Sequence, residues 1–267
     1  MTSTSATPVV FPTLLHGQAA EAVVEFSMRS EVEAVVLVNS CARGAAAPES
    51  DLDVALLIDP GLSTEHRRSM EESWKAWYES RSVFRDLERL SRFSRIHLDL
   101  FDGAFRPEPW DDGGGPDSFE IEIGNRVAHG RPLWERSRAF AQLRARWLPY
   151  YGEDLRRQRL AMVRSSCRLN LERVNAGVAR SLYFHAFDKL YHAFQEFLQA
   201  VFIARRVYPI AYDKWIHEQV HGWLGLPELY AQLPAILEVH QLESDELCDR
   251  ARELLDLLEG WARPDAG

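Results

Sequence analysis

Residues 34–58 read AVVLVNSCARGAAAPESDLDVALLI, and this stretch decides the fold. Its first five residues are apolar and rich in valine, which is typical of a buried strand. Small residues and Pro48 then predict a turn, and Leu52–Ile58 predicts a second strand that stops at the sequence DPG. Two short apolar strands joined by a turn of small residues indicate the centre of a sheet.

The segments around this stretch add helices and one further strand. Apolar spacing predicts a helix over residues 14–28, a long charged helix over 64–92 and a strand over 95–101. In that last strand His97 and Asp99 point to one side, whereas Leu98 and Leu100 point to the other. A loop rich in proline and glycine follows over residues 105–118.

The second half of the chain has a helical pattern from about residue 137 onward. Its clearest helix is predicted over 179–206, where apolar side chains recur every three or four residues from Phe184 to Val201. A last helix is predicted over 244–261. We therefore expect an α+β protein with a sheet-bearing domain over residues 1–135 and an all-α domain over 136–267.

Composition excludes several classes of protein. The 267 residues carry a net charge of −9, which disfavours indiscriminate binding to nucleic acid. No apolar run approaches the roughly 20 residues that span a bilayer, and residues 1–8 lack the pattern of a signal peptide. The three cysteines have no metal-ligand spacing. We expect a soluble, cytoplasmic protein that does not enter membranes.

Three aspartates lie at the start of, or within, predicted strands. Asp51 and Asp53 are two residues apart, so their side chains share one face of the second strand. Two carboxylates held side by side repel each other unless a cation lies between them. If the third strand lies beside the second, Asp99 reaches the same place, and three carboxylates are suited to Mg²⁺.

The turn before these aspartates is suited to phosphate. Backbone N–H groups in a tight turn bind anions, Ser40 adds a hydroxyl and Arg43 adds a guanidinium. Gly44 allows the chain to turn back. The turn therefore predicts a grip for a nucleoside triphosphate.

The order of these features resembles the polymerase-beta-like nucleotidyltransferase superfamily. Its members carry Gly-Ser, an Ala-Arg-Gly-like stretch, Ser-Asp-x-Asp and a later isolated acid. The matching residues here are Ser40, 42–44, 50–53 and Asp99. Over residues 14–135 the resemblance implies a small mixed-sheet domain. The helical remainder is similar to the second domain of small antibiotic-type, kanamycin-like nucleotidyltransferases.

The resemblance also implies an activity and a set of ligands. Members transfer a nucleoside monophosphate from a nucleoside triphosphate, here expected to be ATP, and release pyrophosphate. It implies Mg²⁺ at Asp51, Asp53 and Asp99, and nucleotide contacts from Asn39, Ser40, Arg43 and Ser50. A lysine of the second domain touches the triphosphate in related enzymes, which makes Lys189 and Lys214 candidates.

Asn39 stands where the family has glycine. Asparagine is the residue most at ease after glycine at positive φ, so we expect an altered but working turn. The substitution also leaves open a module that binds nucleotide without transferring it.

The identity of the acceptor rests on weaker signals. Asp99 is the expected general base, and Glu120 and Glu122 are the alternatives. The acidic segment 108–122 would attract a small hydroxyl-bearing polycation of aminoglycoside type, and a charged loop with no role explains it equally well. Residues 131–180 contain twelve arginines against four acids. They form either solvated helix faces paired with acidic neighbours or a surface for an anion, which leaves open an RNA or protein acceptor, as in toxin-like members. The chain is expected to be a monomer or a homodimer.

Overall fold

The computed structural model describes residues 9–28, 31–107 and 113–263, and the chain divides into two compact units. The sheet unit comprises residues 1–106 and 122–149, and the helical unit comprises 107–121 and 150–267. This division differs from the predicted boundary after residue 135. Helix α6 (Ala139–Trp147) belongs to the sheet unit, whereas the described residues 113–121 belong to the helical unit.

The sheet unit is built on four strands. They are β1 (Val32–Leu37), β2 (Leu52–Ile58), β3 (Ile96–Phe101) and β4 (Arg131–Glu135). Their order is β3-β2-β1-β4, with β1 antiparallel to both β2 and β4, and β2 parallel to β3. The strands expected from the apolar runs are present, and the mixed sheet confirms the α+β class.

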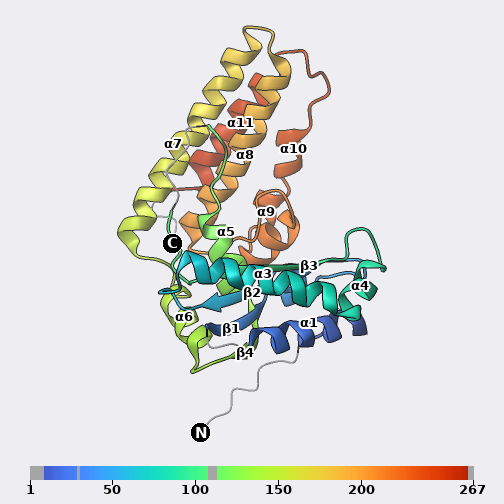
Figure 1. Ribbon diagram of the computed structural model, residues 1–267. Coiled ribbons are helices and arrows are strands. Elements are labelled where there is room, and N and C mark those ends of the chain that lie inside the picture. The colour runs from blue at the N-terminus through green and yellow to red at the C-terminus, as the bar shows by residue number, and fades with distance from the viewer. Residues whose placement is uncertain (1–8, 29–30, 108–112, 264–267) are drawn as a thin grey trace. The chain divides into compact units, whose positions relative to one another are not determined.

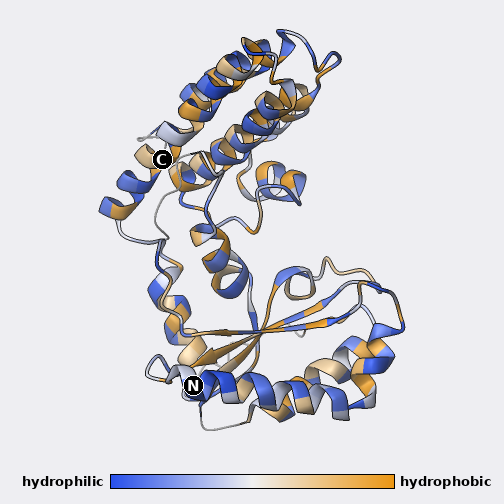
Figure 2. Cartoon of the chain, turned by 45° about the horizontal axis from the view of Figure 1, so that its top comes forward, coloured by the Kyte–Doolittle hydropathy of each residue, from blue (hydrophilic) through white to orange (hydrophobic). Residues whose placement is uncertain are grey.

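Three helices cover one face of this sheet (Figure 1). They are α1 (Leu14–Ser27), α3 (Thr64–Ser80) and α4 (Ser82–Glu88). Figure 2 shows why: the central strands β1 and β2 are mainly apolar, whereas the helices alternate between apolar and polar sides. The largest side chains buried in this layer include Phe26, Leu37, Leu56, Phe84 and Leu87.

The long helix predicted over 64–92 is interrupted at Arg81. This residue has an extended backbone (φ −100°, ψ 124°), and α4 begins directly after it. Its guanidinium lies 3.7 Å from the centre of the Trp77 ring, and Nη2 donates to Glu25 at 2.9 Å. The interruption redirects the chain so that Phe84 and Leu87 are fully buried.

Segments that come later in the chain cover the opposite face of the sheet. Helix α5 (Phe119–Ile123) leads into the π-helical turn η1 (Gly124–Ala128), and α6 follows β4. Ile123, Val127 and Phe140 are buried here. A Cβ added at Gly103 would lie 2.7 Å from Leu143 and 3.4 Å from Leu57, so α6 packs closely against the turn after β3.

The helical unit is a bundle around three long helices. They are α7 (Glu153–Val178), α8 (Tyr183–Arg205) and α11 (Glu246–Trp261). The shorter η2 (His217–Trp223), α9 (Pro227–Tyr230) and α10 (Leu233–Leu237) complete it. Its buried core includes Leu160, Cys167, Phe197, Val201, Leu254 and Leu258. None of the described helices is long and apolar enough to cross a membrane.

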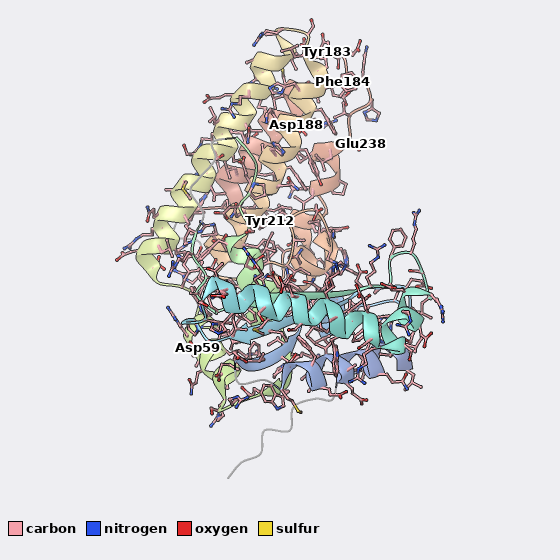
Figure 3. All side chains as sticks on the ribbon, viewed as in Figure 1. Asp59, Tyr183, Phe184, Asp188, Tyr212 and Glu238 are labelled. Atoms are coloured by element: carbon pink, nitrogen blue, oxygen red, sulfur yellow. The ribbon has the colours of Figure 1, made fainter. Side chains whose placement is uncertain are left out.

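Helix α8 begins at Tyr183, four residues later than predicted. Helix α7 continues to Val178, and the chain then reverses through Ser181, which has a φ of +56°. Phe184 therefore lies in the first turn of α8 and is 76% exposed (Figure 3). The apolar stripe predicted from Phe184 is buried only further along, at Phe194, Leu198 and Val201.

Candidate active site

Strand pairing brings the three aspartates to one face of the sheet. In the parallel register Asp53 lies opposite His97, and Ala55 lies opposite Asp99. Residues opposite each other in neighbouring strands share a face, and so do residues two apart. His97 Nε2 also lies 3.8 Å from Asp51 Oδ1. The carboxylates of Asp51, Asp53 and Asp99 therefore lie on the face that points away from α1 and α3.

Asp53 is the most enclosed of the three. Burial raises the pKa of its carboxyl group, and the charges of Asp51 and Asp99 raise it further. A hydrogen bond with the Asn39 side chain and the charge of His97 act in the opposite direction. Mutual repulsion among three carboxylates is the electrostatic setting in which a divalent cation is bound.

Each of the outer carboxylates also has a local partner. Asp51 Oδ1 accepts the backbone N–H of Arg95 at 3.2 Å, and Asp99 Oδ2 lies 3.5 Å from Arg126 Nη2. Within the described residues, no three or more His, Cys, Asp or Glu side chains are arranged as a metal-binding cluster. The oxygen donors suit Mg²⁺ chemically, but their side chains are turned towards protein donors rather than towards one point.

The turn after β1 forms a short helix, α2 (Asn39–Arg43), closed by Gly44 at a φ of +72°. Asn39 has a φ of +55°, the left-handed conformation that was expected where the family has glycine. The backbone N–H of Val38 donates to Asp53 O at 3.0 Å, so the turn starts beside Asp53. Ser40 and Arg43 are both half-buried in this turn.

Cys41 is held against the same carboxylates. Its Sγ donates to the backbone oxygen of Asp51 at 3.4 Å. Burial, with the charges of Asp53 and Asp51, raises the pKa of the thiol to about 12. Cys41 therefore stays protonated at neutral pH and acts as a packing residue rather than as a nucleophile.

Ser50 has a structural role in the turn before Asp51. Its Oγ accepts the backbone N–H of Ala47 at 2.9 Å. Its backbone oxygen lies 3.0 Å from Nε2 of His16, a fully buried histidine of α1. His16 was not recognised in the sequence, because an isolated histidine in an apolar helix carries no motif. The nucleotide contact predicted for Ser50 stays a prediction.

Arg126 is a second residue that the sequence motifs did not reveal. It lies in η1, its guanidinium reaches both Asp99 and Glu122, and its side chain is mostly buried. The spacing of four residues from Glu122 was the available signal, although such pairs are common on helix surfaces. Arg126 orients the third carboxylate, and the Glu122 carboxylate is held by the same guanidinium.

The two candidate lysines belong to the helical unit. Lys189 Nζ donates to the backbone oxygen of Gly113 at 3.2 Å and lies 3.2 Å from Asp188 Oδ2. Lys214 is exposed. Contacts of Lys189 or Lys214 with triphosphate stay predictions.

Two described acids of the segment 108–122, Asp117 and Glu120, belong to a buried ion-pair cluster and not to a solvated rim. Arg159 binds both Asp117 and Glu120, at 2.6 Å in each case. Glu120 is fully buried and also accepts from Tyr151 and Gln199, which makes it unsuitable as a general base. The remaining acids, Glu108, Asp111 and Asp112, lie outside the described residues.

Most of the arginines of segment 131–180 that lie on α7 are likewise engaged within the protein. Arg156, Arg159 and Arg164 are buried. Arg164 binds Glu259 and two backbone oxygens near the end of α11, and Arg168 binds Glu259 as well. This part of the positive charge offers little to an external anion.

Comparisons with known proteins add little to this geometry. No protein-family model matches the chain, and no curated protein matches its sequence. Among solved structures, the chain is similar to a nucleotidyltransferase-like protein from Exiguobacterium sibiricum 255-15. The two share 14% identity and a TM-score of 0.47, over 92% of this chain and 75% of the other. The functional argument therefore rests on the residues themselves.

Proposed function

We propose that the protein is a Mg²⁺-dependent nucleotidyltransferase that moves a nucleoside monophosphate from a nucleoside triphosphate to a hydroxyl group of a small acceptor. ATP is the expected donor. One observation carries the proposal: Asp51, Asp53 and Asp99 share one face of the sheet, directly beside a turn with two residues at positive φ. The sequence resemblance described above motivates the choice of reaction.

The residues have distinct proposed roles. Asp51, Asp53 and Asp99 would hold Mg²⁺, which neutralises phosphate charge when bound. Ser40 and Arg43 would contact the triphosphate, with Lys189 and Lys214 as further candidates. Asp99, whose side chain is 60% exposed, is the proposed general base.

The bond changes are those of an in-line displacement. The acceptor oxygen forms a bond to the α-phosphorus, and the bond from that phosphorus to the bridging oxygen of pyrophosphate breaks. The acceptor proton passes to the Asp99 carboxylate, and pyrophosphate leaves with the electron pair. Arg126 keeps Asp99 in place for this transfer through the 3.5 Å contact.

The test is a mass-spectrometric search for nucleotidylated products and pyrophosphate. Purified protein would be incubated with Mg²⁺, each of four nucleoside triphosphates, and a panel of aminoglycosides, lincosamides and other hydroxyl compounds. We expect transfer by the wild type and a loss of at least about a hundredfold in Asp53→Asn. Asp59→Asn is the matched control, because Asp59 lies exposed just after the same strand. Equal turnover in wild type and Asp53→Asn would contradict the proposal.

One observation favours a second candidate, a nucleotide-binding module without transfer. The Asn39 side chain bonds to Asp53, where a metal ligand would need its oxygens. This alternative predicts that wild-type protein binds nucleoside triphosphate without turnover and that Asn39→Gly gains activity. Transfer by the wild type would exclude it.

A further inference from the structure

Strand β3 is an edge of the sheet, and half of its backbone groups point outward. β3 runs parallel to β2, and the N–H of Leu52 donates to Arg95 O. The backbone N–H and C=O groups of residues 95, 97, 99 and 101 therefore point towards β2. The N–H and C=O groups of Ile96, Leu98 and Leu100 therefore face the opposite way. Tyr78 supports this assignment, because its oxygen has a hydrogen bond with the Ile96 backbone on the α3 side.

A pocket of about 320 Å³ opens on this edge. Leu98, Asp99 and Leu100 form one wall, and Trp74, Arg67 and Arg126 are among the residues around it. Within the described residues, no hydrogen bond uses the outward backbone groups of Leu98 or Leu100. The volume lies at the lower end of the range for ligand pockets, and it contains the proposed general base.

The backbone groups along this wall of the pocket are complementary to those of an extended peptide. Two outward N–H and two outward C=O groups recur every second residue, which is the repeat of an unpaired strand edge. Leu98 and Leu100 turn their side chains to the helix-covered face, where they pack near Trp74. An added strand gains its affinity from main-chain hydrogen bonds and its specificity from alternate side chains.

We propose that the acceptor is a short, extended peptide with a hydroxyl side chain, which pairs with the outward backbone groups of Leu98 and Leu100. This inference rests on the proposed nucleotidyltransferase function and names its acceptor. In such a pairing, the peptide residue opposite Asp99 turns its side chain to the face of Asp51 and Asp53. A serine, threonine or tyrosine there presents its hydroxyl to Asp99.

The same register sets the neighbouring residues of the peptide. The side chains on either side of the hydroxyl residue point to the other face of the sheet, towards Trp74 and the apolar pocket residues Phe26 and Met70. The pattern expected is apolar, hydroxyl, apolar. Arg67 and Arg126 favour acidic residues at the flanks, although Arg67 already pairs with Asp102 at 3.4 Å.

The first experiment measures binding to the wild-type chain. The probes are heptapeptides with Leu-Ser-Leu or Leu-Tyr-Leu at the centre and an acidic residue at each end. Amide hydrogen exchange of the protein is measured with and without each peptide. We expect at least tenfold slower exchange of the Leu98 and Leu100 amides. Peptides N-methylated at single positions should lose at least tenfold in affinity at every second residue and little between. Loss without alternation, or no binding at millimolar peptide, would overturn the proposal.

Variants of the edge provide the second experiment. Leu98→Pro removes an outward N–H and leaves the N–H groups that bond β2 in place, whereas Leu98→Val keeps that N–H. We expect at least tenfold weaker peptide binding in Leu98→Pro alone, with triphosphate binding unchanged as the check on folding. The N-methyl series needs no variant, so it decides the question if Leu98→Pro does not fold.

Failure of this inference is distinguishable from failure of the proposed function. Asp53→Asn should still bind peptide with the alternating pattern but transfer no nucleotide to it. Transfer to a non-peptide acceptor, without peptide binding, would overturn the peptide assignment and leave the transferase standing. Peptide binding without any transfer by the wild type would overturn both the acceptor assignment and the transferase.

Discussion

At the scale of single residues, the site depends on a few backbone positions as much as on its carboxylates. Asn39 holds a left-handed conformation at the start of the phosphate turn, and its side chain reaches Asp53. Gly130 lies just before β4, where there is no room for a side chain. Both positions act on residues of the proposed site, one on Asp53 and the other on the segment that carries Arg126.

Replacement of Asn39 separates its two roles. Asn39→Ala should lower the free energy of unfolding by about 1–2 kcal/mol, because alanine does not tolerate the left-handed conformation. Asn39→Gly is the matched variant, since glycine adopts positive φ freely and loses only the amide contact. Urea unfolding of both variants is the measurement. A greater loss in the glycine variant would show that the backbone conformation is not what Asn39 provides.

Gly130→Ala should be destabilising for a steric reason. The new Cβ would overlap the backbone oxygen of Arg126 and lie 2.9 Å from Val36 Cγ1. We expect a loss of about 1–3 kcal/mol in thermal or urea unfolding, the usual cost of overpacking. Gly260→Ala is the control, because a Cβ there meets nothing within 4 Å. Equal stability of the two variants would contradict this packing.

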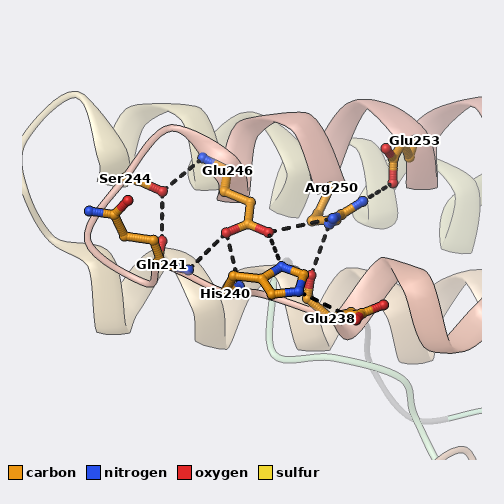
Figure 4. A network of polar contacts seen from close by, with 7 residues as sticks. All are labelled: Glu238, His240, Gln241, Ser244, Glu246, Arg250 and Glu253. Atoms are coloured by element: carbon orange, nitrogen blue, oxygen red, sulfur yellow. Dashed lines mark hydrogen bonds and ion pairs between the residues drawn. The ribbon is translucent and has the colours of Figure 1, made fainter.

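At the scale of elements, the start of α11 is fastened by a polar network (Figure 4). Glu246 accepts the backbone N–H groups of His240 and Gln241, both at 2.9 Å, and Oε1 lies 3.1 Å from His240 Nδ1. Arg250 donates to Glu246 and to the backbone oxygen of Glu238. The network ties the loop after α10 to the first turns of α11.

This network predicts a dependence of stability on acid. The N–H of Gln241, with the side chain of His240, lowers the pKa of Glu246 from 4.5 to about 2. The folded state thus binds the proton less readily than the unfolded state does. The contribution is complete above pH 4.5 and is lost as the pH falls towards 2. When the free energy of unfolding is measured between pH 6 and 2, it should fall less with decreasing pH in Glu246→Gln than in the wild type.

The control for that experiment is Glu243→Gln. Glu243 is an exposed acid of the same loop that is not part of the network. Its variant should follow the wild-type acid profile. A profile of Glu246→Gln that coincides with wild type would mean that the network does not persist in solution.

At the scale of the whole molecule, the chain passes between its two units after residues 106, 121 and 149. The part of the second passage that the structure describes, residues 113–121, is fixed within the helical unit by a buried ionic cluster. Arg159 binds Asp117 and Glu120, Gln199 donates to both acids, and Tyr151 donates to Glu120 at 2.6 Å. The Arg159 guanidinium also lies 4.7 Å from the centre of the Phe119 ring.

Replacement of Arg159, the cation at the centre of this cluster, should therefore lower the free energy of unfolding strongly. Arg159→Leu leaves Glu120 buried without its counter-charge, and we expect a loss of about 3–5 kcal/mol in urea unfolding. Arg157→Leu is the matched control on α7, because its pair with Asp154 is exposed and should contribute less than about 1 kcal/mol. Similar losses in both variants would contradict a buried cluster.

Local patterns in the sequence were sufficient for much of this protein. Apolar runs predicted β1 and β2, alternation predicted β3, and spacing predicted α1 and α11 within a few residues, because each signal lies within one element. The order of Asp51, Asp53 and Asp99 was likewise readable. Their common face followed from strand parity once the neighbouring strands were assumed to be β2 and β3.

Only the tertiary structure decided what long-range packing controls. The break at Arg81, the late start of α8 and the burial of Glu120 depend on partners far away in sequence, which no local period encodes. The meeting of Arg126 with Asp99 and of Arg159 with Asp117 required the fold. Charged residues in segments that suggested an external ligand, such as Asp117, Glu120 and Arg159, are paired inside the protein, because a buried arginine needs an acid beside it.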